Sequence, residues 1–319
     1  MARTADETRD GVELTNLDQP LFDDAGVTKR ALIDYLDAVA DRLLPELADR
    51  PLSVIRVHRG QEAFMQKNVP KYAPDWIRTV TWWSESSHRD VHYALCDDRR
   101  TLLWFGNQRA VEYHPGLLTA SHPDVASFLV LDLDPPEGDG FAAAVGTAHL
   151  VRRVLDDLGL TGAVKTSGAK GVHVFVPVVD LPVADAAAAT RAIAGRVASL
   201  DPDLATVEFL KEDRGGRVFV DATRAGGATV IAAWSPRLRP GVPVSFPVAW
   251  SDLDSVHPTD FTITSVLDRL DSAGPWREVL DEPRPIPADL LEEGHAIPTP
   301  RVQAMHEGKR RKRARESGG

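Results

Sequence analysis

The chain of 319 residues contains only one cysteine, Cys96, so no disulfide can form within it and a reducing compartment such as the cytoplasm is expected. It contains neither a C-x-x-C pair nor an H-E-x-x-H sequence, which excludes the common structural zinc and zincin patterns. Because no run of about 18 apolar residues is present, no membrane span and no membrane partner are predicted. The polar segment Met1–Asp10 does not resemble a secretory leader.

An excess of basic residues is also lacking. With 37 Lys and Arg against 47 Asp and Glu, the formal net charge is −10, which argues against a protein that coats nucleic acid nonspecifically. The charge still permits an enzyme whose basic residues line one groove, because local potential steers a polyanion. The hydrophobic share of 43% is sufficient for a large core in one or two domains.

The hydrophobic pattern predicts an α+β fold in which strands and helices do not follow a regular βαβ repeat. Residues 1–11 are predicted to be disordered, residues 12–283 to form the catalytic domain, and residues 284–319 to form a tail rich in proline and charge. The tail ends in the basic run Lys309–Arg315, which is either a solvated end or a flexible tether to DNA or RNA.

Helix and strand signals alternate along the chain. A helix is expected to begin after the N-cap residue Thr28 and to kink or end at Pro45. Residues 102–112 fit either a strand or a helix. Further helices are expected near 141–158, with Asp139 as the cap, near 184–200 and near 263–272. Strands are expected near 52–57, 91–95, 128–134, 164, 173–178, 207–210, 217–221 and 229–233.

Three aspartates stand at the ends of apolar, strand-like runs. Asp132 and Asp134 end the run that begins at Phe128, and residues two apart on a strand point to the same face. Carboxylates this close repel each other, and Mg²⁺ or Mn²⁺, which favour oxygen ligands, would relieve the repulsion. Asp221 ends the run Val218–Val220. Taken singly, each aspartate is more typical of an ordinary strand-ending turn.

A glycine-rich loop, Ser167–Gly171, precedes another strand-like run. Its glycines allow backbone N–H groups to converge on a phosphate, and Lys170 adds a positive charge. His173 follows at a position from which it can bond a phosphate or ribose oxygen. Taken singly, the loop is typical of a glycine hairpin and the histidine of a structural residue. The basic residues after Glu208 suit either a triphosphate clamp or a solvated face: Lys211, Arg214, Arg217, Arg224, Arg237 and Arg239.

In this combination and order, the segments resemble the polymerase domain of bacterial ligase D, the end-joining branch of the archaeo-eukaryotic primase superfamily. The resemblance extends from Leu14 to about Leu270. The matching segments are Leu131–Pro135, Thr166–His173, Arg217–Asp221, Met65–Asn68 and Asn107–Gln108. The resemblance implies a primase-polymerase fold with central mixed or antiparallel sheets, and template-directed nucleotidyl transfer that uses two Mn²⁺ or Mg²⁺ ions.

The same resemblance implies a role for individual residues. Asp132, Asp134 and Asp221 would be the catalytic residues that hold the metal ions. The residues implied to bind the nucleotide are His114, Ser167, Lys170, His173, Arg214, Arg224, Arg237 and Arg239. The residues implied to bind the DNA template and its 5′-phosphate are Asn16, Lys29, Phe64 and Lys67.

The chain departs from the family pattern at two positions. Asn16 and Lys29 match a pocket for the 5′-phosphate at a break, but Gln19 stands where lysine is usual, which should weaken phosphate binding. Met65 follows Phe64 where a second phenylalanine is usual, so one stacking ring is missing, and stacking is worth about 1–3 kcal/mol per base. No ligase or nuclease module is recognised, as expected of a stand-alone relative or an excised domain.

These features favour a DNA/RNA polymerase that fills gaps or extends ends during bacterial non-homologous end joining. Its expected partners are gapped or broken DNA, NTPs or dNTPs, Ku and a separate DNA ligase, in the cytoplasm at the nucleoid. Two alternatives remain open. One is a primase-polymerase that initiates chains without a primer. The other is a non-catalytic scaffold that bridges DNA ends, for which the basic tail and the altered 5′-phosphate pocket are the motivating observations.

Overall fold

The computed structural model describes residues 6–58, 60–84, 88–138, 140–226, 228–270, 276, 280 and 282–299. The chain divides into two compact units, each assembled from separate stretches of sequence. The first unit comprises Met1–Asp124, Lys165–Ala169 and Gly227–Leu280, and the second comprises Val125–Val164, Lys170–Gly226 and Asp281–Gly319. The predicted cap Asp139 and the basic run at 309–315 lie outside the described residues.

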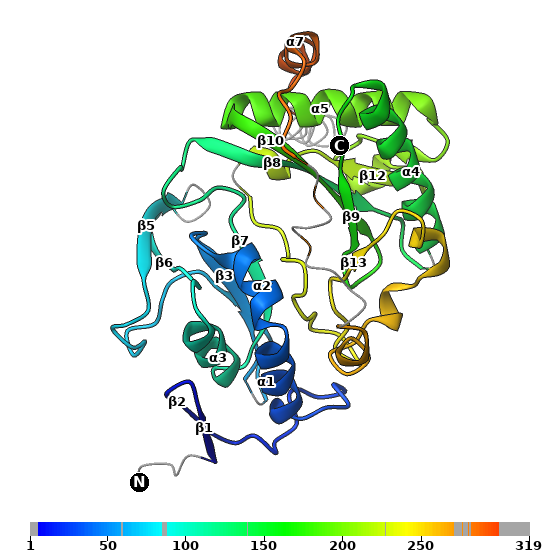
Figure 1. The fold of residues 1–319 in the computed structure, drawn as a ribbon. Helices are drawn as coiled ribbons and strands as arrows, with labels where there is room; N and C mark the ends of the chain where they lie inside the picture. The colour runs from blue at the N-terminus through cyan, green and yellow to red at the C-terminus, as the bar shows by residue number, and fades with distance from the viewer. Residues whose placement is uncertain are drawn as a thin grey trace, which may run out of the picture. The chain divides into compact units, whose positions relative to one another are not determined.

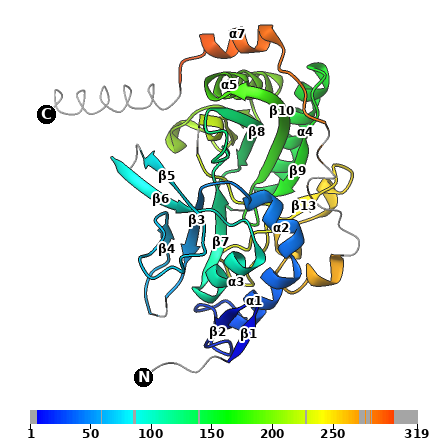
Figure 2. The ribbon, with the colours of Figure 1, turned by 60° about the vertical axis from the view of Figure 1, so that its left-hand side comes forward.

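The first unit is built on an antiparallel sheet of order β4-β3-β6-β5, with β7 paired to β3 (Figure 1; β4 is labelled in Figure 2). β-branched and aromatic residues such as Val54 and Tyr113 fill its strands, and both of these are buried. The predicted strands at 52–57 and 91–95 are therefore confirmed. The strands are β3 (Leu52–Arg56), β4 (Phe64–Gln66), β5 (Thr79–Ser84), β6 (Arg89–Ala94) and β7 (Ala110–Pro115).

The helices of the first unit are α1 (Lys29–Ala38), α2 (Ala40–Leu47) and α3 (Arg99–Asn107). Thr28 caps α1 as predicted, since its side chain accepts a hydrogen bond from Ala31 N. The predicted break at Pro45 is wrong, because the helix is interrupted at Val39 and Pro45 lies inside α2. Residues 102–112 combine both predicted alternatives, since α3 ends at Asn107 and β7 begins at Ala110.

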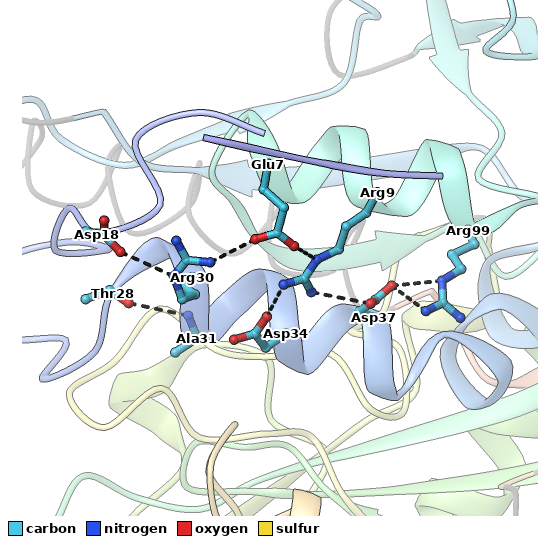
Figure 3. Close-up of polar contacts among 9 residues, drawn as sticks. All are labelled: Glu7, Arg9, Asp18, Thr28, Arg30, Ala31, Asp34, Asp37 and Arg99. Atoms are coloured by element: carbon cyan, nitrogen blue, oxygen red, sulfur yellow. Dashed lines mark hydrogen bonds and ion pairs between the residues drawn. The ribbon is translucent and has the colours of Figure 1, made fainter. Parts of the chain in front are cut away.

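Residues 6–11 are ordered, contrary to the predicted disorder of residues 1–11, of which residues 1–5 lie outside the described part of the chain. Strand β1 (Glu7–Arg9) pairs antiparallel with β2 (Val12–Leu14) across a turn at Asp10 and Gly11, both of which have positive φ. Leu14 is fully buried. Arg9 binds Asp34 and Asp37 of α1, which ties the hairpin to that helix (Figure 3). A tertiary ion network therefore orders a segment whose polar composition predicted disorder.

The second unit contains a sheet with the strand order β11-β12-β8-β10-β9. β8 lies in the middle, antiparallel to both β10 and β12, which explains its apolar residues Leu129, Leu131 and Leu133. β9 crosses the boundary between the units, because its last two residues belong to the first unit. The strands are β8 (Val125–Asp134), β9 (Ala163–Thr166), β10 (Val172–Pro182), β11 (Ala205–Thr206) and β12 (Val218–Asp221).

Helices α4 (Phe141–Asp157) and α5 (Val183–Leu200) pack against β8, β10 and each other. The last helix within the described residues, α7 (Ala288–Ala296), lies along α5 (Figure 2). A Cβ at Gly294 would lie 2.0 Å from the Ala188 carbonyl oxygen, so only glycine allows this contact between α7 and α5. The part of the predicted tail that contains α7 is therefore folded against the second unit.

Three other predicted elements are wrong. Residues 207–210 are not a strand; β11 ends at Thr206, and Val207 is 41% exposed. At 229–233 only an isolated bridge between Thr229 and Gly116 is present. The helix predicted at 263–272 is, within its described residues, only the short 3-10 turn η5 (Leu267–Arg269). A short β13 (Pro247–Val248) lies in the first unit.

Candidate active site

Three adjacent strands of the second unit place acidic and imidazole side chains in one row. Asp132 on β8 is the register partner of Asp221 on β12 and of His173 on β10. Opposed residues on antiparallel strands have their Cβ atoms about 4.5–5.5 Å apart, so the three side chains are neighbours. Asp134, two residues further along β8, points to the same face as Asp132.

Arg224 links two of the carboxylates. It opens the short helix η2 (Arg224–Gly226), three residues after Asp221. Its Nη2 donates to Asp132 Oδ2 at 3.1 Å, and its Nε lies 3.3 Å from Asp221 Oδ2. His173 Nε2 lies 3.2 Å from the other Asp132 oxygen. Because the side chains of Asp132 and Asp221 are only 13% and 7% exposed, the guanidinium balances charges that water solvates poorly.

Gly171 sets the spacing between β10 and β8. A Cβ at this position would lie 2.4 Å from the carbonyl oxygen of Leu133, the residue between the two aspartates of β8. Only glycine therefore allows the backbones to approach at this point, immediately before His173 pairs with Asp132. The loop glycine that suggested phosphate binding thus also fixes the acidic row.

The carboxylates share one electrostatic environment. The pKa of Asp134 is raised above its ordinary value, first by burial and then by the charge of Asp132, with a further contribution from Asp221. The positive charges of Lys170 and Arg214 act in the opposite direction. Additional positive charge at this position would therefore stabilise the ionised carboxylates.

The chemistry of these donors fits a hard divalent cation, since carboxylate oxygens are the ligands that Mg²⁺ and Mn²⁺ favour. Among the residues that the structure describes, however, no three His, Cys, Asp or Glu side chains are placed so that they could hold a metal ion. The Arg224 guanidinium instead contacts Asp132 and Asp221. An ion at these two carboxylates would have to replace those contacts.

Lys170 lies near this row and is paired at the surface. Its Nζ is 3.3 Å from Glu137 Oε1, and Lys211 Nζ is 3.5 Å from the same oxygen. Glu137 is 81% exposed, so solvent screens both ion pairs. Lys170 can therefore exchange Glu137 for an anionic ligand at little cost.

Arg214 is held beside the acidic row by an aromatic ring. Its guanidinium lies over Phe219, 4.0 Å from the ring centroid, and its Nη2 donates to the Phe209 carbonyl at 3.1 Å. Phe219 is in turn the register partner of Asp134. The cation–π contact thus positions a positive charge next to the strand ends that carry the carboxylates.

In the first unit, Glu112 orients two of the predicted nucleotide-binding residues. Its side chain lies 2.8 Å from His114 Nε2 and 3.5 Å from Arg237 Nε, and accepts a 2.8 Å hydrogen bond from Leu238 N. Burial opposes ionisation, yet the His114 bond, the Arg237 charge and the Leu238 bond keep the pKa of Glu112 below its ordinary value. Sequence reasoning missed Glu112, although its spacing from His114 places both on one face of β7.

The predicted nucleotide loop is divided between the units, because Ser167 belongs to the first and Lys170 to the second. Ser167 is 7% exposed, and its Oγ accepts from Ala169 N at 3.2 Å, so this hydroxyl shapes the loop. Gly168 has φ +65°, and a Cβ there would lie 2.6 Å from Arg237 Cγ. Arg239 follows on the same segment and is exposed.

The predicted DNA-binding residues all lie in the first unit. Lys29 is only 2% exposed, and its Nζ donates to Thr15 O and Asn107 Oδ1, each at 2.6 Å. Asn16 has φ +56° and accepts from Gln19 Nε2 at 3.1 Å. Asn16 and Lys29 are joined through Gln19, whose backbone oxygen accepts a hydrogen bond from Lys29 N at 2.9 Å.

Phe64 and Lys67 lie on and just after the edge strand β4. Phe64 is 38% exposed, and the His58 ring stacks on it with centroids 5.4 Å apart and an interplanar angle of 24°. Met65 is 46% exposed. The His58 ring thus partly replaces the second phenylalanine ring that is missing at Met65. Sequence reasoning did not select His58, because it lies outside the matching segments.

Together, the fold and the acidic row define a polymerase domain of the primase type. The LigD primase-polymerase domain model matches residues 28–276, and the chain belongs to this family. The predicted family and the predicted α+β primase-polymerase fold are confirmed. Within the described residues, no helix is long and apolar enough to cross a membrane.

Two named relatives and one solved structure illustrate the similarity. The bifunctional non-homologous end joining protein LigD of Bacillus subtilis is 35% identical over 283 residues, which are 85% of this chain and 45% of that protein. The multifunctional non-homologous end joining DNA repair protein LigD of Mycobacterium tuberculosis H37Rv is 35% identical over 296 residues, 88% of this chain and 38% of that protein. This chain thus spans less than half of either relative.

The solved structure is the polymerase domain from Mycobacterium tuberculosis ligase D in complex with DNA. It is 33% identical to this chain, with a TM-score of 0.78, and the match covers 84% of this chain and 97% of that one. The similarity therefore includes nearly all of a polymerase domain but not the remainder of the longer LigD proteins. The roles of individual site residues stay predictions.

Proposed function

We propose that this protein is a DNA-directed nucleotidyltransferase that adds nucleotides to a primer 3′-hydroxyl, filling gaps or extending ends during non-homologous end joining. The observation that carries the proposal is the register of β12, β8 and β10, which aligns Asp221, Asp132 and His173 in one row. Family membership and the similarity to a polymerase domain solved with DNA support it. Neither the primase nor the scaffold alternative is favoured by an observation in the described residues.

Asp132, Asp134 and Asp221 would hold two Mn²⁺ or Mg²⁺ ions once the Arg224 contacts to Asp132 and Asp221 are replaced. The ions would supply Lewis-acid activation of the hydroxyl and charge neutralisation. His173 Nε2 contacts Oδ1 of Asp132, the carboxylate oxygen that Arg224 does not contact, and so limits rotation of the Asp132 carboxylate. Arg224 contacts both Asp132 and Asp221 and balances part of their charge. These contacts preorganise the carboxylates, which lowers the cost of ordering them during the reaction.

Cations of the second unit would bind the triphosphate of an NTP or dNTP. Lys170 is paired with the exposed Glu137, and Arg214 is fixed over Phe219 with donors on a rigid plane. His114 and Arg237, which Glu112 orients, are the proposed nucleotide contacts of the first unit. DNA, Ku and a separate ligase are the proposed partners, and the proposed location is the cytoplasm at the nucleoid.

Substitution of Asp132 tests the assignment of the active site. Asp132→Ala should reduce primer extension on a gapped duplex by at least about 1,000-fold, because one metal ligand and the His173 contact are lost together. DNA affinity measured without nucleotide should change little. Asp203→Asn, which removes an exposed acid of the same unit, should leave extension unchanged. Normal extension by Asp132→Ala would reject the assignment.

The choice of substrates separates the proposal from its alternatives. The wild-type protein should extend a primer on a gapped template with Mn²⁺ or Mg²⁺ and either ribo- or deoxyribonucleotides. It should make no product from a template and nucleotides without a primer. Short products in the primer-free reaction would indicate a primase, and DNA binding without extension under every condition would indicate a scaffold.

A further inference from the structure

A second cation lies beside the residues expected to bind a 5′-phosphate, and nothing in the sequence patterns pointed to it. Arg109 follows α3, only two residues after Asn107, and its backbone has φ +59°, a conformation that few residues with side chains adopt. It belongs to a hydrogen-bonded group in the first unit that is called the amide–cation cluster below. The members of this cluster are Asn16, Gln19, Lys29, Asn107 and Arg109.

The Arg109 guanidinium is fixed by the loop that contains Gln19. Its Nη1 donates to the carbonyl oxygens of Pro20 at 2.9 Å and Leu21 at 2.6 Å. Its Nη2 donates to Gln19 Oε1 at 3.0 Å. Three hydrogen bonds on two nitrogens determine the plane of the guanidinium, so its position depends on folding of the loop and not on a free rotamer choice.

Gln19 connects the guanidinium of Arg109 to the side chain of Asn16 by hydrogen bonds. The Gln19 oxygen accepts from Arg109, and the Gln19 nitrogen donates to Asn16 Oδ1 at 3.1 Å. The amide oxygen of Asn16 thus accepts a hydrogen bond. The amide nitrogen of Asn16 stands at the end of this series of hydrogen bonds and carries two N–H donors. A lysine at position 19 could not do this, because an ammonium group has donors only and could not accept from Arg109.

Lys29 contributes charge to the same cluster but little surface. It is 2% exposed, and its ammonium donates to Thr15 O and Asn107 Oδ1. Asn107 also accepts from Thr15 N at 3.1 Å, which joins the loop to the end of α3. Arg109 is partly exposed, so of the two cations it offers the more accessible contact to a ligand.

The cluster also lies close to the aromatic edge of the first unit. The pKa of His58 is lowered by burial, by the charge of Arg56 and by the charge of Arg109. Arg109 therefore acts electrostatically on the ring that stacks on Phe64. A positive group next to an exposed stacking surface suits the end of a DNA strand, where a terminal phosphate adjoins a base.

We propose that Arg109 is a specificity-determining residue that binds the 5′-phosphate monoester of a downstream DNA strand, and that Gln19 is the residue that positions it. Arg109 thereby supplies the cation that Gln19 lacks. Its guanidinium has five N–H donors in one plane, so it can donate to a phosphate in addition to Pro20, Leu21 and Gln19. The proposal rests on the proposed polymerase function, because it assumes that gapped DNA is the ligand.

The test is the ratio of affinities for two gapped duplexes that differ only in a 5′-phosphate or a 5′-hydroxyl on the downstream strand. Fluorescence anisotropy without metal or nucleotide gives both dissociation constants. The wild-type protein should bind the phosphorylated duplex about tenfold more tightly. Arg109→Gln should reduce this ratio to about one and lower the salt slope for the phosphorylated duplex by about one.

Arg30 provides a matched control one residue after Lys29. Its side chain is bound by carboxylates, with Nη1 2.9 Å from Glu7 Oε2 and Nε 3.2 Å from Asp18 Oδ1 (Figure 3). Arg30→Gln removes the same charge from the same neighbourhood and should leave the ratio near the wild-type value. If Arg30→Gln lowers the ratio as much as Arg109→Gln does, general electrostatics explain the preference and the proposal fails.

A rescue variant distinguishes loss of the cation from damage to the loop. The double variant Arg109→Gln with Gln19→Lys returns a positive charge to the cluster, now at position 19. It should restore at least about half of the loss in the ratio of affinities for the two duplexes. Gln19→Ala should reduce the ratio with Arg109 still present, because the guanidinium loses its orienting acceptor. Thermal unfolding of each variant shows whether the loop remains folded.

Two further results would overturn the proposal. One is a wild-type ratio near one, and the other is an Arg109→Gln protein that keeps the wild-type ratio. Neither result depends on catalysis, since metal and nucleotide are absent from the binding experiment. Failure of the proposed polymerase function would instead appear as a wild-type protein that does not extend a primer.

Discussion

The acidic row of the second unit and the amide–cation cluster of the first unit are built in different ways. In the row, strand register alone places Asp221, Asp132 and His173 side by side. In the cluster, a loop, a helix start and a helix end bring together Gln19, Lys29 and Arg109. The comparison shows that strands position chemistry through local periodicity, whereas loops position it through specific tertiary hydrogen bonds.

The largest effect is expected where the register of the row is broken. Gly171→Ala should lower the free energy of unfolding by about 2–3 kcal/mol, because the new Cβ would lie 2.4 Å from the Leu133 carbonyl oxygen. It should also abolish extension by separating His173 from Asp132. Urea unfolding measures the first effect and primer extension the second.

A control for Gly171 lies inside α5. The nearest atom to a Cβ at Gly195 is Ile297 Cδ1 at 3.9 Å, so Gly195→Ala meets no obstacle. It should raise stability by about 0.5–1 kcal/mol, because alanine favours a helix. A Gly171→Ala protein as stable as the wild type would contradict the view that glycine is required between β8 and β10.

The second-largest effect on stability is expected at Glu112, which stabilises the fold through tertiary contacts and not through strand register. Its pKa is lowered in the folded protein, so its contribution is present above its ordinary value of 4.5 and is lost as the pH falls through the folded pKa. Glu112→Gln should therefore cost about 1–2 kcal/mol at neutral pH and progressively less in acid. Urea unfolding at several pH values from neutral to about 3, well below the ordinary pKa of 4.5, measures this convergence.

Glu137 is the matched control for that experiment. The pKa of its carboxyl is also lowered, by Lys170 and Lys211, but the side chain is exposed to solvent. Glu137→Gln should therefore leave the urea midpoint unchanged at every pH. A constant difference between Glu112→Gln and the wild type across the pH range would show that the Glu112 charge does not stabilise the fold.

The smallest effect is expected for Arg224, the cation within the acidic row, and concerns the affinity for Mn²⁺. Because the Arg224 guanidinium contacts Asp132 and Asp221, Arg224→Gln should raise Mn²⁺ affinity by about three- to tenfold in the absence of nucleotide. Electron paramagnetic resonance of free Mn²⁺ measures the affinity. Arg217→Gln is the control, because Arg217 donates to backbone carbonyls such as Arg214 O. Unchanged or weaker Mn²⁺ binding in Arg224→Gln would show that the guanidinium does not compete with a metal ion.

The acidic row could be predicted from sequence because each part of it is local. Apolar runs that end in Asp132 and Asp221 specify strands, and alternation specifies the shared face of Asp134. The pairing of Asp132 with both Asp221 and His173 required the sheet order, which periodicity does not determine. Family resemblance supplied the expectation that these strands meet.

The remaining errors have a common physical origin. Val207 had the composition of a strand residue, but the paired strand β11 ends one residue earlier, and Val207 is exposed. Arg9 looked like part of a disordered start, yet ion pairs with α1 order the hairpin. Glu112 and Arg109 were missed, because their partners Leu238 and Gln19 lie 126 and 90 residues away. In each case contacts distant in sequence decided the outcome.

The path of the backbone limits how this protein can be cut and recombined. The chain passes from one unit to the other after Asp124, Val164, Ala169, Gly226 and Leu280. No single truncation therefore yields either unit as a continuous polypeptide, and a chimera with a relative would need several simultaneous junctions. The short passage Lys165–Ala169 is the most restrictive, since grafting the glycine-rich loop means transplanting pieces of both halves at once.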